Sequence, residues 1–165
     1  MKKLLIVLAV YLVVGALGFS LADPVDLVLN TTILGTSVLT VNGVSGPNSS
    51  SQLEINTLGT PVTVSYSYVG NQPVKLKVTS LNASTYSTGF RLIVSGTPSE
   101  FIPYALAIDY DGLGTYSATA SGTAVNLPTS TGIYNLNSTM QITLQDGVYG
   151  AGTYTDTLTF EIEAQ

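Results

Sequence analysis

The chain ends with GAGTYTDTLTFEIEAQ, residues 150–165, and this stretch decides the fold. Threonines stand at every second position from 153 to 159, and aromatic, acidic and apolar residues stand between them. Side chains of a strand point alternately to the two faces of its sheet, so this spacing predicts a strand with one polar and one apolar face. We expect Leu158, Phe160 and Ile162 to point into the core from this last strand.

Most other apolar stretches also alternate with a period of two, which indicates strands with one buried face. Further strands are expected at residues 37–42, 52–58, 62–68, 74–78, 90–94, 102–110 and 140–144. Residues 116–137 are less regular and predict a weak edge strand plus a loop. No helix is expected after residue 22. Several short strands separated by turns predict an all-β fold, an antiparallel two-sheet sandwich.

Gly70-Asn71 lies between two of these strands and is typical of a tight hairpin, because glycine accepts the positive φ that such turns need. We therefore expect residues 62–68 and 74–78 to pair with each other as antiparallel neighbours.

The first 22 residues have the order of a secretory signal peptide. Lys2 and Lys3 precede an apolar run from Leu4 to Phe19, and Ser20-Leu21-Ala22 supplies small residues for cleavage. An uncleaved membrane anchor is the alternative, since the run is only slightly short for a membrane span. We expect cleavage after Ala22, contact with the membrane only during export, and a secreted, extracellular protein at the cell surface.

Residues 23–35, DPVDLVLNTTILG, are predicted to form an extended strand ahead of a sandwich domain that occupies residues 36–165. One hypothesis makes this segment the first strand of the chain's own sandwich. The other makes it a donor strand that adds to an open sheet edge of the next subunit. The side chains that would form the donor face share every second position: Val25, Leu27, Leu29, Thr31 and Ile33.

The charge and cysteine content exclude several classes of protein. After removal of the signal peptide, Lys75, Lys77 and Arg91 stand against ten acidic residues, a net charge of −7. Binding to nucleic acid requires a basic surface, so no nucleic-acid partner is expected. The chain has no cysteine and hence no disulfide, so core burial, backbone pairing or contacts with other subunits must hold it together.

The absence of histidine and cysteine also removes most catalytic chemistry. A Ser/His/Asp triad, a cysteine nucleophile and an ordinary zinc site all need these residues. Asp109 and Asp111 in the DYDG stretch remain conceivable as paired carboxylates or as calcium ligands, but acids beside a glycine more often form turns. We therefore expect no enzyme, no catalytic residue, no metal site and no cofactor.

Four Asn-x-Ser/Thr sequons make glycans conceivable partners. Asn30 lies on the face opposite Val25 and Leu27, so a glycan there would point away from a buried donor face. The candidate glycosylation sites are Asn30, Asn48, Asn82 and Asn137.

Three stretches resemble the spore coat protein U family and related chaperone–usher pilins: GTPVTVSYSYVG, FIPYALAIDYDGLGTYSATASGTA and YGAGTYTDTLTFEIEAQ. The likeness covers roughly residues 59–163. Its motif lies in Gly152, Thr153, Tyr154, Asp156 and Thr157. Members of that family usually carry cysteines, whereas cysteine-free, tyrosine-rich chains with sequons are more similar to the thread-type filament subunits of thermophilic archaea.

Both resemblances imply an Ig-like, pilin-like sandwich that lacks one strand and receives it from the adjacent copy. The leading hypothesis is thus an exported structural subunit of a filament, pilus or coat, with other copies of itself as partners in a head-to-tail homopolymer. Inward residues of the first and last strands would line the acceptor groove, with Leu158, Phe160 and Ile162 as the best candidates. The alternative is a monomeric secreted module for carbohydrate binding or adhesion, with tyrosines as stacking platforms.

Overall fold

The computed structural model of the chain describes residues 37–46, 49–94, 97–128 and 134–165. The chain divides into two units, residues 1–33 and 34–165, and every described residue belongs to the second. The proposed signal peptide and donor strand, with Val25, Leu27, Leu29, Thr31 and Ile33, lie outside the described residues.

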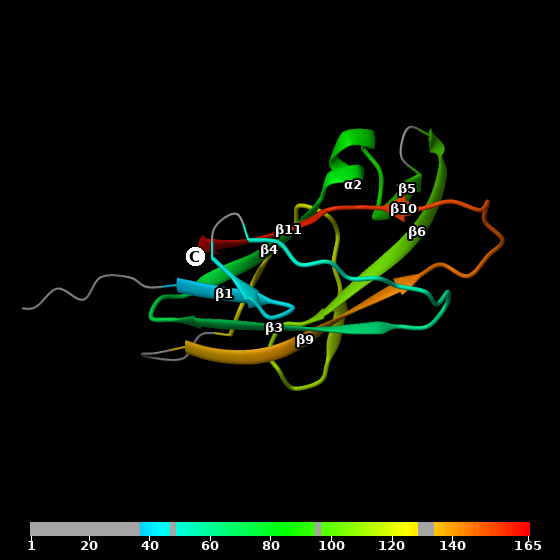
Figure 1. The fold of residues 1–165 in the computed structure, drawn as a ribbon. Coiled ribbons are helices and arrows are strands. Elements are labelled where there is room, and N and C mark those ends of the chain that lie inside the picture. Colours follow the sequence, from blue (N-terminus) through cyan, green and yellow to red (C-terminus); the bar gives the residue numbers. More distant parts are fainter. Residues whose placement is uncertain (1–36, 47–48, 95–96, 129–133) are drawn as a thin grey trace, which may run out of the picture. The chain divides into compact units, whose positions relative to one another are not determined.

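The described residues form two antiparallel sheets, as the alternating sequence pattern predicted (Figure 1). The large sheet has the strand order β10-β5-β6-β9-β3-β1-β2. Its remaining strand, β7, also pairs with β6. The small sheet has the order β11-β4-β8. The large-sheet strands are β1 (Ser37–Val41), β2 (Val44–Ser45), β3 (Val62–Gly70), β5 (Arg91–Val94), β6 (Thr97–Asp109), β7 (Tyr116–Ala118), β9 (Tyr134–Leu144) and β10 (Tyr154–Thr155). The small-sheet strands are β4 (Val74–Ser80), β8 (Ala124–Asn126) and β11 (Leu158–Ala164).

The core lies between the sheets and is built from every second residue of their strands. Its most deeply buried members come from both sheets: Tyr68, Leu76, Leu106, Ile108 and Met140. Full burial of a large apolar side chain stabilises a fold by about 1.5–3 kcal/mol, so these positions supply much of the folding free energy of a chain without disulfides. The sequence prediction of an all-β sandwich is confirmed.

The predicted hairpin between residues 62–68 and 74–78 is wrong. β3 pairs with β1 and β9 in the large sheet, whereas β4 pairs with β11 and β8 in the small sheet. The turn at Gly70-Asn71 therefore carries the chain from one sheet to the other. Both strands still direct their alternating apolar residues inward, because each strand contributes one face of its sheet to the core between the sheets.

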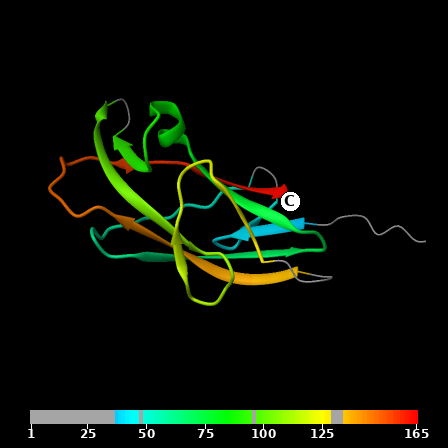
Figure 2. The ribbon, with the colours of Figure 1, turned by 180° about the vertical axis from the view of Figure 1, so that it is seen from behind.

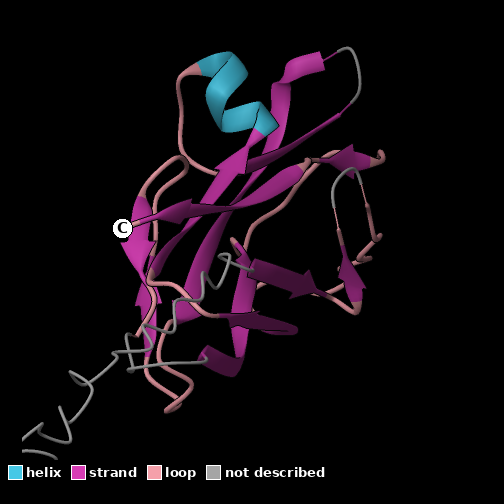
Figure 3. Cartoon of the chain, turned by 90° about the vertical axis from the view of Figure 1, so that its left-hand side faces the viewer, coloured by secondary structure: helices cyan, strands magenta, loops and turns pink. Residues whose placement is uncertain are grey.

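Two other expectations fail locally. Residues 52–58 form no strand, and only Ile55 in that stretch packs against the core. A short helix, α2 (Leu81–Tyr86), stands where none was expected, beside β4 and β5 (Figure 3). Ser80 caps it, because its side chain accepts a hydrogen bond from the N–H of Ala83 at 2.9 Å. Within the described ranges, no helix is long and apolar enough to cross a membrane.

Candidate subunit-binding edge

The C-terminal motif positions the start of β11 through the carboxylate of Asp156. The hydroxyls of Ser80 and Tyr104 both donate to Oδ2, each at 2.6 Å. The backbone N–H groups of Thr157 and Asn82 donate to Oδ1 at 2.8 and 3.1 Å. Hydrogen bonds to an ionised acceptor are about twice as strong as neutral ones, so this cluster, the Asp156 clamp, ties β11 firmly to β4 and β6.

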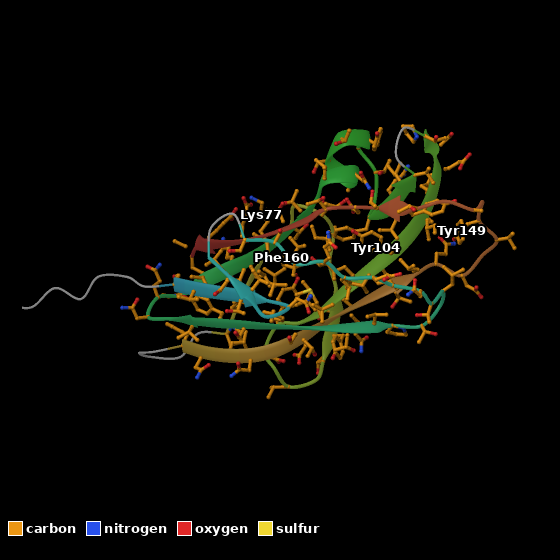
Figure 4. All side chains as sticks on the ribbon, viewed as in Figure 1. Lys77, Tyr104, Tyr149 and Phe160 are labelled. Carbon is orange, nitrogen blue, oxygen red and sulfur yellow. The ribbon has the colours of Figure 1, made fainter. Side chains whose placement is uncertain are left out.

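Tyr104, one of the two hydroxyl donors of the clamp, is buried inside the sandwich (Figure 4). Burial, followed by the hydrogen bond to Asp156, raises the pKa of the Tyr104 hydroxyl well above its ordinary value. Its ring also stacks on Phe90, with the ring centroids 5.3 Å apart. Tyr104 is therefore a neutral hydrogen-bond donor held in one orientation.

Beyond the clamp, every second residue of β11 pairs its backbone N–H and C=O groups with β4. The register joins Phe160 to Val78 and continues past both ends of the ladder. The N–H of Leu81 donates to the carbonyl of Thr157 at 2.9 Å, and the N–H of Gln165 donates to the carbonyl of Pro73 at 3.3 Å. In an antiparallel pair, alternate residues form the hydrogen-bonded pairs, so the odd-numbered residues of β11 direct their backbone groups to β4.

The even-numbered residues of β11 direct their backbone groups the other way, toward an edge with no neighbour. β11 is the end strand of the small sheet, and in the described part of the chain it pairs with β4 alone. The same residues, Leu158, Phe160 and Ile162, turn their side chains toward the core but remain only partly buried. Figure 4 shows Phe160 on the side of β11 that faces the large sheet. Unpaired backbone and incompletely covered apolar surface thus coincide on three residues.

The facing part of the large sheet is also incompletely covered. β1 contacts β11 across this side of the sandwich, and its inward residues Leu39 and Val41 are partly buried members of the core. We call this side the seam, defined by the partly buried inward residues of the two strands: Leu39, Val41, Leu158, Phe160 and Ile162. The sequence named the β11 members and predicted inward residues of the first strand as well, but it did not single out Leu39 and Val41.

The outer face of β11 is held to β4 by charge. Lys77 Nζ lies 3.0 Å from Glu161 Oε2 and 2.7 Å from Glu163 Oε1. The hydrogen bonds that Lys77 donates to Glu163 and then to Glu161 raise its pKa. Lys77 lies outside the sandwich in Figure 4, where solvent screens such pairs, so they favour one register more than they add stability.

The DYDG stretch forms a turn that its two carboxylates hold together. Asp109 accepts from the N–H groups of Gly112 and Gly114, both at 2.9 Å, and Asp111 accepts from the N–H of Leu113 at 3.0 Å. Burial alone would raise the pKa of Asp109, but the Gly114 N–H and other donors outweigh it, so its pKa lies below the ordinary value. Within the described residues, no group of three or more acidic side chains could hold a metal ion.

The two described sequons differ in how their amides are used. Asn82 Nδ2 donates to the carbonyls of Thr155 at 2.7 Å and Arg91 at 3.0 Å, so both of its hydrogens are engaged. Asn137 is exposed on β9, and its Nδ2 makes one long bond of 3.3 Å to Asn135 Oδ1. The other two candidates, Asn30 and Asn48, lie outside the described residues.

A small hollow of about 380 Å³ lies between the DYDG turn, β7, β8 and the C-terminal residue. One aromatic residue, Tyr110, borders it together with polar residues such as Asp111, Asn126 and Gln165. Three other tyrosines that the carbohydrate hypothesis could have used, Tyr66, Tyr68 and Tyr104, are core residues.

Comparison with known proteins supports the fold. No protein-family model matches the chain, and no curated protein matches it significantly. A chain of the chaperone–tip adhesin complex of CFA/I fimbriae is similar in structure, with a TM-score of 0.50 and 14% identity over 77% of this chain and 42% of that one. A chain of the CsuC–CsuE chaperone–tip adhesion subunit pre-assembly complex, from the archaic chaperone–usher Csu pili of Acinetobacter baumannii, has a TM-score of 0.50 and 16% identity over 80% and 40% of the two chains.

The chain spans about two fifths of the length of these two solved chains. At such low identity the likeness shows the fold alone, which is an Ig-like antiparallel sandwich of the kind found in chaperone–usher pilus complexes. The closer resemblance to spore coat protein U stays a prediction.

Proposed function

We propose that the chain is an exported, non-enzymatic subunit of an extracellular filament, pilus or coat, and that it polymerises by donor-strand exchange. The observation that carries this proposal is the open edge of β11. There, Leu158, Phe160 and Ile162 combine unpaired backbone groups with partly exposed apolar side chains. An added strand satisfies both needs at once, since it supplies ladder hydrogen bonds and alternate side chains together.

The occupant we propose is the segment of residues 23–35 from a second copy. Val25, Leu27 and Leu29 repeat at every second position, the spacing with which inward side chains of β11 also repeat. At about 3.3 Å per residue, thirteen extended residues reach well past the seven residues of β11. The segment carries two acidic residues and no basic residue. Apolar contact and backbone pairing would therefore hold it in place, rather than attraction between charges.

The energetics favour a stable joint. Each large apolar side chain that becomes fully buried contributes about 1.5–3 kcal/mol, and each new backbone hydrogen bond about 0.5–1.5 kcal/mol. A strand in one copy that fits an edge in the next makes a head-to-tail contact, which extends into a fibre when it does not close. Dissociation would require the removal of a whole strand from a core, so such a fibre would be kinetically stable.

Removal of the donor segment tests the proposal. The mature chain from Asp23 is expected to form fibres or a ladder of oligomers, whereas a chain that begins at Gly35 is expected to remain monomeric in size-exclusion chromatography. Within the full mature chain, Leu27→Asp is expected to block assembly, and Val28→Asp, on the opposite face, serves as the matched control. Fibres formed by the chain from Gly35 would contradict donor-strand exchange.

The second candidate is a monomeric module that binds carbohydrate at the hollow beside Tyr110. An aromatic ring next to carboxylate and amide side chains is the chemistry that suits a sugar. A single small species in solution and glycan binding that is lost in Tyr110→Ala would favour it over the filament.

A further inference from the structure

Residues 49–58, which we call the strap, form no strand, although residues 52–58 have the alternating sequence pattern of one. Within the described ranges, no hydrogen bond involves residues 52–58, and the first backbone bond after the strap joins the N–H of Gly59 to the carbonyl of Leu144 at 2.9 Å. At its start, Ser49 Oγ donates to the carbonyl of Ser45 at 2.9 Å and Asn42 Nδ2 donates to Ser51 Oγ at 3.3 Å. The strap is therefore tied at its ends and loose in the middle.

The strap runs along the open side of the sandwich. Figures 1 and 2 show its cyan trace passing between β11 and β3 in both views. Ile55 is its one half-buried residue and packs against the core, whereas Leu53 and Leu58 keep 44% and 39% of their surface exposed. Gly46 and Gly59, with φ of +99° and +67°, stand just outside its two ends. Glycine adopts such angles with less strain than residues that carry a side chain, so it suits the sharp changes of direction at both ends.

We infer that the strap is the seam's own temporary cover, which shields the inward residues of β11 before assembly and is displaced by the incoming strand. This inference rests on the proposed function. A segment with one anchoring side chain and no backbone pairing in its middle is weakly held, whereas the donor strand brings five side chains and a hydrogen-bonded ladder to the same place. The strap thus slows premature association and still yields to the correct partner.

Thiol labelling tests the shielding without any need for assembly, because the chain has no cysteine of its own. Phe160→Cys is made alone and together with Ile55→Ser, and the rate of maleimide labelling is measured at dilutions where the chain is monomeric. We expect Ile55→Ser to speed labelling about fivefold, in line with the loss of a half-buried isoleucine. Thr159→Cys, on the outer face of the same strand, should label at one rate in both backgrounds. If Phe160→Cys disturbs folding by circular dichroism, Ile162→Cys replaces it.

Assembly kinetics test the displacement. Ile55→Ser is expected to shorten the assembly half-time of the mature chain about fivefold, while Leu113→Ser, a change of the same kind in a distant turn that is 81% exposed, leaves it unchanged. Equal labelling rates with and without Ile55→Ser overturn the strap. So does assembly of Ile55→Ser at the wild-type rate. If the wild type fails to assemble, the proposed function fails instead, and the labelling rates alone decide whether the strap shields β11.

Discussion

The Asp156 clamp lies just before β11 and the seam runs along β11 and β1, and the two regions differ in how completely their polar and apolar groups are satisfied. At the start of β11, one carboxylate receives four hydrogen bonds, and every buried side-chain nitrogen or oxygen in the described residues has a partner. Along the free edge of β11, backbone groups have no strand to pair with in the described part of the chain, and the apolar side chains are only partly buried. The comparison indicates that the clamp and the pairing with β4 fix the register of β11. The other edge of β11 can therefore stay unpaired without loss of the strand's position.

Loss of the clamp should have the largest effect on stability. Asp156→Ala leaves the Ser80 and Tyr104 hydroxyls and two backbone N–H groups without their acceptor, so we expect a loss of about 2–4 kcal/mol in the free energy of unfolding. Urea denaturation of the monomeric chain from Gly35 measures it. Thr153→Ala, in the same motif, is exposed and serves as the control, and an unchanged urea midpoint for Asp156→Ala would remove the contrast between the two regions.

A change in the seam should affect assembly more than stability. Phe160→Ala removes a partly buried ring, so we expect a loss of about 1–2 kcal/mol in the monomer, below the value for a fully buried aromatic residue. Assembly of the mature chain, followed by light scattering, should fall at least tenfold. Thr159→Ala is the matched outward control. Equal assembly by both variants would show that the inward face of β11 takes no strand.

The two described sequons, at Asn82 and Asn137, should differ in the same way. The side chain of Asn82 supports the fold, whereas that of Asn137 is exposed and accessible. Asn82→Ala removes two hydrogen bonds to backbone carbonyls near the clamp and should cost about 1–2 kcal/mol, whereas Asn137→Ala should stay within about 0.5 kcal/mol of the wild type. Mass spectrometry of the chain from its native cells should find a glycan at Asn137 in preference to Asn82. A glycan at Asn82 in the folded protein would refute this assignment.

The last expected effect is the pH dependence of stability. Asp109 has a lowered pKa in the folded chain, so its contribution is present above the unfolded value of about 3.9 and is lost as the pH falls below it. Burial raises the pKa of Tyr66 and Tyr104, so stability should also fall once the pH exceeds about 10, where the unfolded tyrosines ionise first. Urea midpoints across the pH range give both limbs, and a flat alkaline limb would contradict the burial of these hydroxyls.

The sequence predicted most strands because alternation depends on which face is buried, and burial is a local property of each strand. It could not predict that β3 and β4 belong to different sheets, since their inward faces have the same pattern in a hairpin and in a crossing between sheets. It also predicted a strand at residues 52–58, because Leu53 and Ile55 alternate with polar residues, although pairing depends on a neighbour that the described fold does not supply.

The candidate site was predictable in part. Leu158, Phe160 and Ile162 followed from their spacing, and the structure places all three on β11, the end strand of the small sheet. The sequence placed Asp156 in the C-terminal motif but did not predict its hydrogen bonds. Its partners Ser80 and Tyr104 lie 76 and 52 positions away in the sequence. The sequence could not show that the strap pairs with no other strand among the described residues, since its alternating residues have the same local pattern as those of a paired strand.

Amide hydrogen exchange along β11, measured residue by residue in monomer and fibre, tests the central claim most directly. Thr159, Glu161 and Glu163 pair with β4 and should be protected in both states. Leu158, Phe160 and Ile162 should exchange rapidly in the monomer and become protected in the fibre, as a neighbour's strand takes up their backbone groups. If these three amides stay unprotected in the fibre, or are already protected in the monomer, no strand is added at this edge.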